Sequence, residues 1–229
     1  MSEIKPIALP GTHQKFLRWF NAQNYPLSTR ILDIGAGHGA FSKQLHEMGF
    51  QVQACDLFPE MFHYEGIECK KVDVTAPFPY ADGAFDLVIA IEVLEHVLDH
   101  EVFFGEVNRI LVPGGKFEAS TPNILNMKSR MRFLLTGFYY SFKPLELNNY
   151  NGLQHINART VDQYNYIAQK HGFETAALEI DKKQRSSIWL MTFWSPFLWI
   201  YPKMKKIKPI HNLPKLLVGR LLFLSFRKK

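Results

Sequence analysis

Three glycines separated by single residues form the segment of the chain most suited to holding a ligand. Gly35, Gly37 and Gly39 follow a short apolar run and precede a segment with helical periodicity. Glycines let the chain turn tightly and let a ligand approach the backbone, and the helix that follows offers free N–H groups at its start. The segment also satisfies the G-x-G-x-x-[GA] pattern of dinucleotide-binding loops, which by itself is a weak indicator.

Acidic residues in and after the first three expected strands favour a cationic ligand over a pyrophosphate. Asp33 lies two residues before the first glycine, where a carboxylate suits a ligand that carries an ammonium and a sulfonium group. Asp56 closes the second strand, about 20 residues after the loop, where an acid accepts hydrogen bonds from ribose hydroxyls. Asp73 follows the third strand, placed to meet an adenine amino group. S-adenosylmethionine (SAM) carries all of these groups, and Asp33 disfavours a nicotinamide cofactor.

A second group of polar residues follows the fourth apolar run. If Glu92 opens a helix there, Glu95 and His96 lie one turn further on, near the carboxyl edge of the sheet. Two carboxylates and an imidazole suit Mg²⁺ or another divalent ion. The alternative is that Glu95 and His96 cap or pair within their helix. His38, inside the glycine loop, is expected to be a surface residue.

The elements that position these residues alternate between apolar runs and helical patterns. This alternation implies βαβ units and a parallel sheet. We predict strands at residues 31–35, 51–56, 69–74, 85–91 and 116–121, with helices at 13–24, 40–49 and 92–111.

The second half of the chain departs from this alternation. Residues 122–159 are rich in Asn, Tyr and Phe and are predicted to form a cap insertion over the carboxyl ends of the strands, with one helix near 126–136. A helix over 160–171, N-capped by Thr160, and strands at 172–181 and 220–229 follow. We predict a single domain, 1–229, with an apolar and basic excursion over 186–218 before the last strand.

Charge is distributed unevenly. All 21 Asp and Glu residues precede residue 182, whereas residues 182–229 hold 12 of the 27 Lys and Arg residues. Residues 188–201 hold three of the four tryptophans, but the run is shorter than the roughly 20 residues of a membrane-spanning helix, and Pro196 interrupts it. Tryptophan and phenylalanine beside lysine are typical of a segment that lies on anionic lipid.

We therefore predict an anionic membrane surface as a partner for residues 186–229. Packing of the aromatic residues on the sheet or in a dimer is the alternative. Nucleic acid is a less favoured partner, because the lysines flank apolar stretches. Cys55 and Cys69 form no disulfide framework, and the first ten residues contain no apolar run. These features predict a cytoplasmic protein, peripheral at the inner membrane face.

Together, the D-x-G-x-G-x-G loop, Asp56, Asp73, the segment FDLVIAIEVLEHV and the segment RILVPGGKF resemble the class I SAM-dependent methyltransferases. The resemblance covers about residues 28–121, and more loosely 160–181 and 219–229. It implies a Rossmann-like, doubly wound α/β fold with a mostly parallel seven-stranded sheet of order 3-2-1-4-5-7-6, strand 7 being antiparallel. The expected cofactor-binding residues are Asp33, Gly35, Gly37, Gly39, Asp56, Leu57, Asp73, Val74 and Ile91.

Two branches of this superfamily are similar in their metal motif. The ubiquinone-pathway O-methyltransferases and the enzymes that methylate the 2′-hydroxyl at small-RNA 3′ ends both carry E-x-x-E-H, associated with a divalent metal. The RNA enzymes have a further His after a Thr-Pro-Asn segment. Here residues 121–123 read Thr-Pro-Asn, which makes His155 a candidate ligand beside Glu92, Glu95 and His96. Without metal, His155 or His96 is the candidate base.

The expected function is methyl transfer from SAM, directed to oxygen. A hydroxyl acceptor needs a base or a metal, and the Asn/Asp-Pro-Pro-Tyr signature of amino-directed enzymes is absent after the fourth strand. The absence of this signature is also compatible with methyl transfer to a carbon atom. We expect a lipid-linked, quinone-like or glycan acceptor. The alternatives are an RNA 2′-O-methyltransferase and a SAM-binding, membrane-associated module without catalysis.

Overall fold

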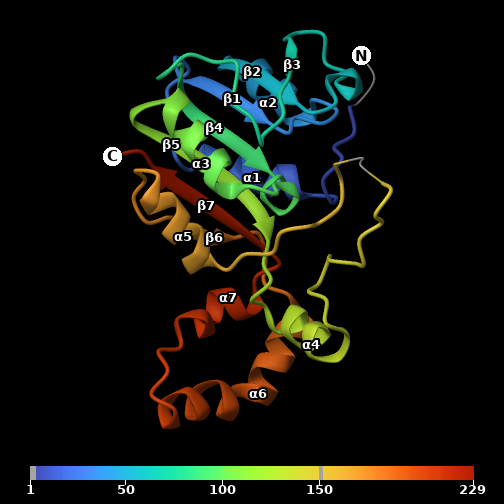
Figure 1. The fold of residues 1–229 in the computed structure, drawn as a ribbon, viewed down its shortest axis with the longest axis vertical. Helices are drawn as coiled ribbons and strands as arrows, with labels where there is room; N and C mark the ends of the chain where they lie inside the picture. The colour runs from blue at the N-terminus through green and yellow to red at the C-terminus, as the bar shows by residue number, and fades with distance from the viewer. Residues whose placement is uncertain (1–3, 150–151) are drawn as a thin grey trace.

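The computed structural model describes residues 4–149 and 152–229, and a seven-stranded sheet forms its centre (Figure 1). The strand order is β3-β2-β1-β4-β5-β7-β6. Strand β7 runs antiparallel to β5 and β6, and the other pairs are parallel. The predicted sheet is therefore confirmed. The strands are β1 (Arg30–Ile34), β2 (Gln51–Asp56), β3 (Cys69–Lys71), β4 (Phe85–Ile91), β5 (Leu111–Pro122), β6 (Ala177–Ile180) and β7 (Leu221–Arg227).

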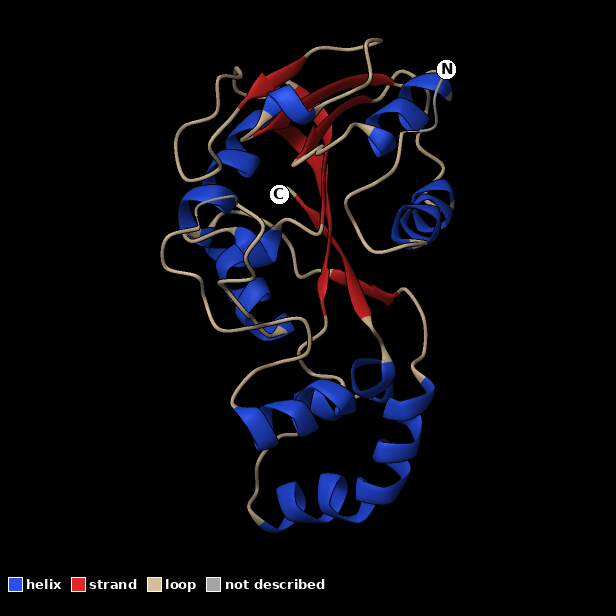
Figure 2. Cartoon of the chain, turned by 90° about the vertical axis from the view of Figure 1, so that its right-hand side faces the viewer, coloured by secondary structure: helices blue, strands red, loops and turns tan. Residues whose placement is uncertain are grey.

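Helices cover both faces of this sheet (Figure 2). Strand side chains alternate between the faces: Leu32 and Val88 pack with α3 and α5, whereas Ile31 and Leu87 pack with α1 and α2. Because both faces are buried, the central strands are apolar along their length. The helices and 3-10 turns are α1 (Thr12–Asn21), α2 (Ala40–Glu47), η1 (Pro59–Met61), η2 (Leu94–His96), α3 (His100–Ile110), α4 (Met127–Thr136), α5 (Val161–Lys170), α6 (Arg185–Met204), η3 (Ile210–Asn212) and α7 (Pro214–Val218).

The region after β4 differs from the single helix predicted over 92–111. Glu92 has a φ of 56°, which ends the strand in a left-handed turn that a helix cannot continue. The short turn η2 follows, and α3 begins only at His100. Asp99 caps α3, because its Oδ1 accepts hydrogen bonds from the backbone N–H groups of Glu101 (2.9 Å) and Val102 (3.1 Å).

Helices α4, α6 and α7 with η3 form what we call the helical lobe, which extends beyond the end of β5 (Figure 1). Its own small core contains Met127, Leu217 and Val218. Asn123, directly after β5, ties the lobe to the sheet by donating to the backbone oxygens of Leu216 (2.7 Å) and Gly219 (2.9 Å). Residues 150 and 151 of the predicted cap lie outside the described residues.

Helix α6 is the main departure from the expected tail. Pro196 was expected to interrupt the apolar run, but α6 continues through Pro196 and Pro202. Pro196 has no N–H to offer the Thr192 carbonyl, and Ser195 Oγ donates to that carbonyl instead at 2.8 Å. None of the helices that the structure describes combines the length and apolar character needed for a membrane span.

Candidate active site

The glycine loop is held in a conformation that suits glycine. Gly35, Gly37 and Gly39 have φ values of 68°, 53° and 83°. Asp56 fixes the middle of the loop, because its Oδ2 accepts a hydrogen bond from the Gly37 N–H at 2.8 Å. Gly35 packs closely on the turn after β4: a Cβ added to it would lie 2.5 Å from Val93 Cγ2. The glycine loop and the Glu92–His96 region are therefore adjacent.

Gly35→Ala is expected to destabilise the protein by more than the 1–3 kcal/mol typical of strained backbone alone. The added Cβ meets both an unfavourable φ and the Val93 side chain. Gly137→Ala is a matched control, because Gly137 has a φ of 73° but nothing within 4 Å of its added Cβ. Urea unfolding of both variants separates the two contributions. Equal losses would show that the contact with Val93 is unimportant.

Asp33 is a buried acid beneath the glycine loop. Its side chain accepts a hydrogen bond from Ser42 Oγ at 2.5 Å, and the residue is 2% exposed. Burial raises the pKa of Asp33 to about 7. An acid in this state gains strongly from a nearby cation, because the cation stabilises the ionised form that burial disfavours.

The other acids expected at the cofactor site lie at the ends of their strands. Asp56 ends β2, and its Oδ1 also accepts from the Phe58 N–H at 2.9 Å. Asp73 is exposed and accepts from both the N–H (2.9 Å) and the hydroxyl (2.7 Å) of Thr75, which lowers its pKa. These two carboxylates thus shape the loops that bear them. Leu57 is partly exposed, Val74 is half-buried, and Ile91 is buried at the end of β4.

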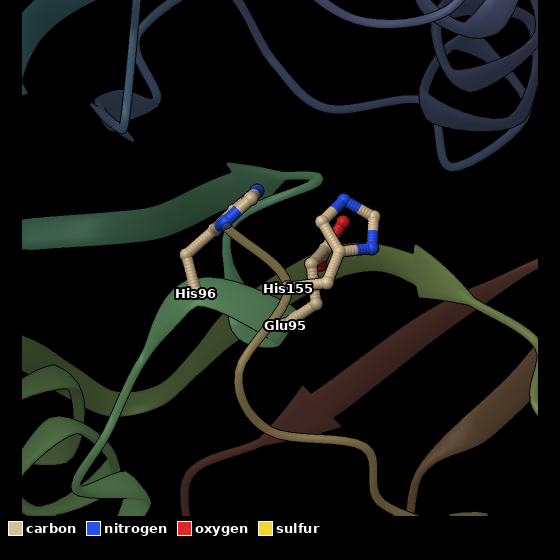
Figure 3. A group of neighbouring side chains, drawn as sticks. All are labelled: Glu95, His96 and His155. Atoms are coloured by element: carbon tan, nitrogen blue, oxygen red, sulfur yellow. The ribbon is translucent and has the colours of Figure 1, made fainter. Parts of the chain in front are cut away.

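Glu95, His96 and His155 come together at one point (Figure 3). One ligand atom from each lies within 4.8 Å of the others. The backbone oxygen of Glu95 accepts from the N–H groups of Ile156 (2.9 Å) and Asn157 (3.1 Å), which docks the segment after the cap onto η2. Residues 60 positions apart in sequence therefore share one site.

Two atoms of this group have no hydrogen-bond partner among the described residues. They are Glu95 Oε1 and His155 Nδ1, both buried. Burial, with Glu92 nearby, raises the pKa of Glu95 well above its usual value. Burial also lowers the pKa of His96, and it lowers that of His155 to about 4. Both imidazoles are therefore neutral near pH 7, the form that binds metal or accepts a proton.

The orientation of His96 is fixed by its surroundings. Its Nδ1 lies 2.9 Å from the backbone oxygen of Gln154 and must donate to it, which leaves Nε2 with a lone pair. Glu95 is likewise held by Thr121 Oγ1, which donates to Oε2 at 3.1 Å. The donor set of one carboxylate and two neutral imidazoles fits a divalent transition ion or Mg²⁺.

Glu92, the fourth expected ligand, lies outside this group. Its left-handed backbone turns the side chain to β5, where Oε1 accepts from Ser120 Oγ at 2.9 Å. The backbone N–H of Glu92 donates to the backbone oxygen of Ser120 at 3.1 Å. Burial raises the pKa of Glu92 to about 7. Its effect on the group is electrostatic, through the pKa of Glu95.

Sequence reasoning missed the hydroxyl residues that orient the acids. Ser42 holds Asp33, Ser120 holds Glu92, and Thr121 holds Glu95. A signal existed for the last two: they end the fifth predicted strand, whose carboxyl end had to lie beside that of the fourth. No comparable signal linked Ser42 to Asp33. His38 is half-buried and pairs with the Lys5 backbone oxygen.

A family model described as a methyltransferase domain matches residues 11–178. This range contains the glycine loop, Asp33 and the group formed by Glu95, His96 and His155. The chain belongs to this methyltransferase family. Together with the strand order, the match confirms the resemblance to class I SAM-dependent methyltransferases.

The methyltransferase is similar over part of its length to curated relatives. It is 32% identical over 116 residues to the ubiquinone biosynthesis O-methyltransferase of Xanthomonas axonopodis pv. citri, covering 47% of this chain and 48% of the relative. It is 33% identical over 107 residues to the 2-methyl-6-phytyl-1,4-hydroquinone methyltransferase of Synechocystis sp., covering 43% of this chain and 33% of the relative. The chain thus spans about half, or less, of the length of these relatives.

A solved structure supports the fold over nearly the whole chain. The SAM-dependent methyltransferase from Mesorhizobium loti superposes with a TM-score of 0.59 at 19% identity, covering 93% of this chain and 98% of the other. By family and fold, this protein is a class I SAM-dependent methyltransferase.

Proposed function

We propose that this methyltransferase transfers the methyl group of SAM to a hydroxyl oxygen of an amphiphilic small molecule. The observation that carries the proposal is a pair of buried atoms without a hydrogen-bond partner among the described residues, Glu95 Oε1 and His155 Nδ1. Glu95 lies two residues after Val93, the residue that packs on the glycine loop. Unpartnered polar atoms cost free energy when buried, so their convergence suits a ligand that uses them. In this proposal both atoms would face the acceptor beside the methyl donor.

The donor would occupy the glycine loop. Asp33 in its ionised form would hold the cationic end of SAM, Asp56 and Asp73 would bind the ribose and adenine, and Leu57, Val74 and Ile91 would lie beside them. When bound, SAM supplies an electrophilic methyl group on a positively charged sulfur. The residues of the chain align donor and acceptor and exclude water, which are the main requirements of an in-line transfer.

Activation of the acceptor hydroxyl falls to the group of Glu95, His96 and His155. A divalent ion held by these three residues would supply positive charge that lowers the pKa of the hydroxyl. Without the ion, His155 would accept the hydroxyl proton directly at Nδ1, and the positive charge that results would favour the ionised form of the neighbouring Glu95. Methyl transfer that survives EDTA selects the second route.

The acceptor class follows from the relatives and the helical lobe. Two similar proteins are named for methyl transfer in ubiquinone biosynthesis and to a phytyl hydroquinone, both lipid-linked rings. A quinone-like phenol is therefore the first candidate, and a lipid-linked glycan the next. RNA ranks below these, because the lobe's lysines adjoin apolar rather than polar surface. A cytoplasmic protein that works at the inner membrane face fits this acceptor.

A screen with methyl-labelled SAM tests this function. Catechols, prenylated hydroquinones, lipid-linked glycans and RNA would be offered with Mg²⁺ or with EDTA, and the labelled product analysed for an O-methyl group. Label on a phenolic oxygen supports the proposal. Label only on nitrogen, only on RNA, or on no acceptor despite tight SAM binding would contradict it, and the last result would favour a non-catalytic SAM-binding module.

Metal binding is expected to release a proton from Glu95 near neutral pH. Burial raises the pKa of Glu95 and so favours its protonated form, whereas a bound cation favours the ionised form. Affinity for Mn²⁺ should therefore rise with pH. Calorimetric titration with Mn²⁺ at pH 6.5 in two buffers of different ionisation enthalpy measures the released proton. Binding that is independent of both buffer and pH would count against Glu95 as a ligand.

A further inference from the structure

Helix α6 carries a continuous apolar stripe that the protein leaves uncovered. Its members recur every three or four residues, so they share one side of the helix within an arc of about 80°. We call them the outer stripe, and each is 56–78% exposed: Trp189, Phe193, Phe197, Ile200 and Met204.

The opposite side of α6 is the one that packs. Met191, Trp194 and Leu198 join the small core of the lobe, which contains Met127 and Leu217. The helix is thus apolar all round but covered on one side only. Such a helix is stable in water only at the cost of exposed apolar area, which marks an interaction surface rather than a solvated face.

Lysines surround the end of the outer stripe. Lys203, Lys205, Lys206 and Lys208 are all exposed, and the chain contains no Asp or Glu after residue 181. Each lysine near an anionic bilayer contributes roughly 1 kcal/mol to binding. The combination of aromatic side chains, an aliphatic stripe and lysines without acids is complementary to a negatively charged lipid surface.

A cavity of about 440 Å³ opens between α4, the end of α6 and η3. Arg130 lines it together with Phe133 and Lys208. The Arg130 guanidinium donates to neutral oxygens: Leu125 O (2.7 Å), His211 O (2.6 Å) and the Asn212 side chain (2.9 Å). Among the described residues no carboxylate pairs with it, and two of its five N–H groups remain for a ligand. An anionic lipid headgroup suits this cavity.

We propose that the helical lobe docks on an anionic membrane, with the outer stripe of α6 inserted at the boundary between headgroups and acyl chains. Figure 2 shows α6 bent at the far end of the lobe from the sheet, so insertion would leave the body in water. The bend is expected of a helix with an internal proline. The proposal rests on the lobe alone, and it deepens the proposed function by placing the protein where an amphiphilic acceptor resides.

Vesicle flotation with the full chain tests the docking. Vesicles of phosphatidylcholine alone are compared with vesicles that also contain phosphatidylglycerol, at low and high salt. Three variants are compared with the unmodified chain. They are Trp189→Ser/Phe193→Ser/Phe197→Ser in the stripe, Lys205→Glu/Lys206→Glu beside it, and Leu27→Ser/Tyr166→Ser as a control that removes exposed apolar side chains from the body.

The expected result is flotation with the phosphatidylglycerol vesicles, weakened at least about tenfold by either lobe variant and unchanged in the control. Equal flotation of the stripe variant and the control, or no flotation of the unmodified chain, would overturn the proposal. So would a dimer in light scattering that the stripe variant dissociates without any vesicle binding, which would assign the stripe to a second copy of the chain. SAM binding and transfer to a water-soluble phenol, measured on the same variants, report separately on the proposed function.

Discussion

Glu95→Gln is expected to lower kcat for methyl transfer on the order of 100-fold or more while SAM binding persists. The amide keeps the shape of the side chain and can still accept the Thr121 hydrogen bond, but it can neither bind a divalent ion as an anion nor stabilise a charged His155. Because burial disfavours the ionised form of Glu95 in the folded protein, the substitution to a neutral amide should cost little stability.

Steady-state kinetics and a melting curve on the same sample measure both effects. Glu101→Gln is the control: Glu101 is partly exposed on α3, where it pairs with Lys170 and His171 and takes no part in the group of Glu95, His96 and His155. An E95Q protein that melts normally and retains full activity would remove Glu95 from the chemistry. An E95Q protein that is inactive because it has lost its fold would be recognised by the melting curve, and Thr121→Val would then probe the same carboxylate from its partner.

The second large effect concerns the methyl donor. Asp33→Asn is expected to weaken SAM binding on the order of 100-fold, about 3 kcal/mol, because the cationic end of SAM loses its carboxylate partner. Glu118→Gln provides a matched control, since Glu118 is also fully buried, has a pKa raised to about 7, and pairs with Tyr25 on the sheet face covered by α1. Calorimetric titration with SAM measures both. Tight SAM binding by D33N would refute the assignment.

The same substitution should act oppositely on the free protein. Asp33 has a folded pKa of about 7, above its usual value of 3.8, so its contribution to stability is present in acid and is lost as pH rises through 7. The D33N protein without SAM should therefore melt above the unmodified protein at pH 8, and the difference should close near pH 4. A gap that is constant with pH would indicate that Asp33 is not the titrating group.

The fold and the left-handed turns of the glycine loop were predictable because both depend on local signals. Alternating apolar runs identified the parallel strands, and Asp33 before Gly35 predicted a SAM loop rather than a dinucleotide loop. Both signals lie in residues that are close in sequence. Burial of a strand there requires apolar side chains, and a tight turn requires glycine. The positions of the last two strands in the sheet were predicted only through the family resemblance. An antiparallel β7 between β5 and β6 depends on long-range pairing, which leaves no local signal in the sequence.

The acceptor side was less predictable for physical reasons. The direction in which the Glu92 side chain points depends on a left-handed backbone conformation that a non-glycine residue rarely adopts. It also depends on hydrogen bonds with Ser120, which lies on a different strand, β5. The joining of His155 to Glu95 depends on backbone hydrogen bonds across 60 residues. Likewise, the continuation of α6 through Pro196 depends on a local substitute bond from Ser195, a tertiary detail that overrides a general rule.

The separate core of the helical lobe has a consequence for how such proteins diversify. The two cores that pack on the sheet contain no residue of α6, and the lobe joins them through Leu216 of α7 and through the side chain of Asn123 at the end of β5. Substitutions on α6 can therefore accumulate with little stability penalty to the sheet. Selection is then free to redirect one and the same catalyst to a new surface or acceptor, while the machinery that recognises the methyl donor is conserved.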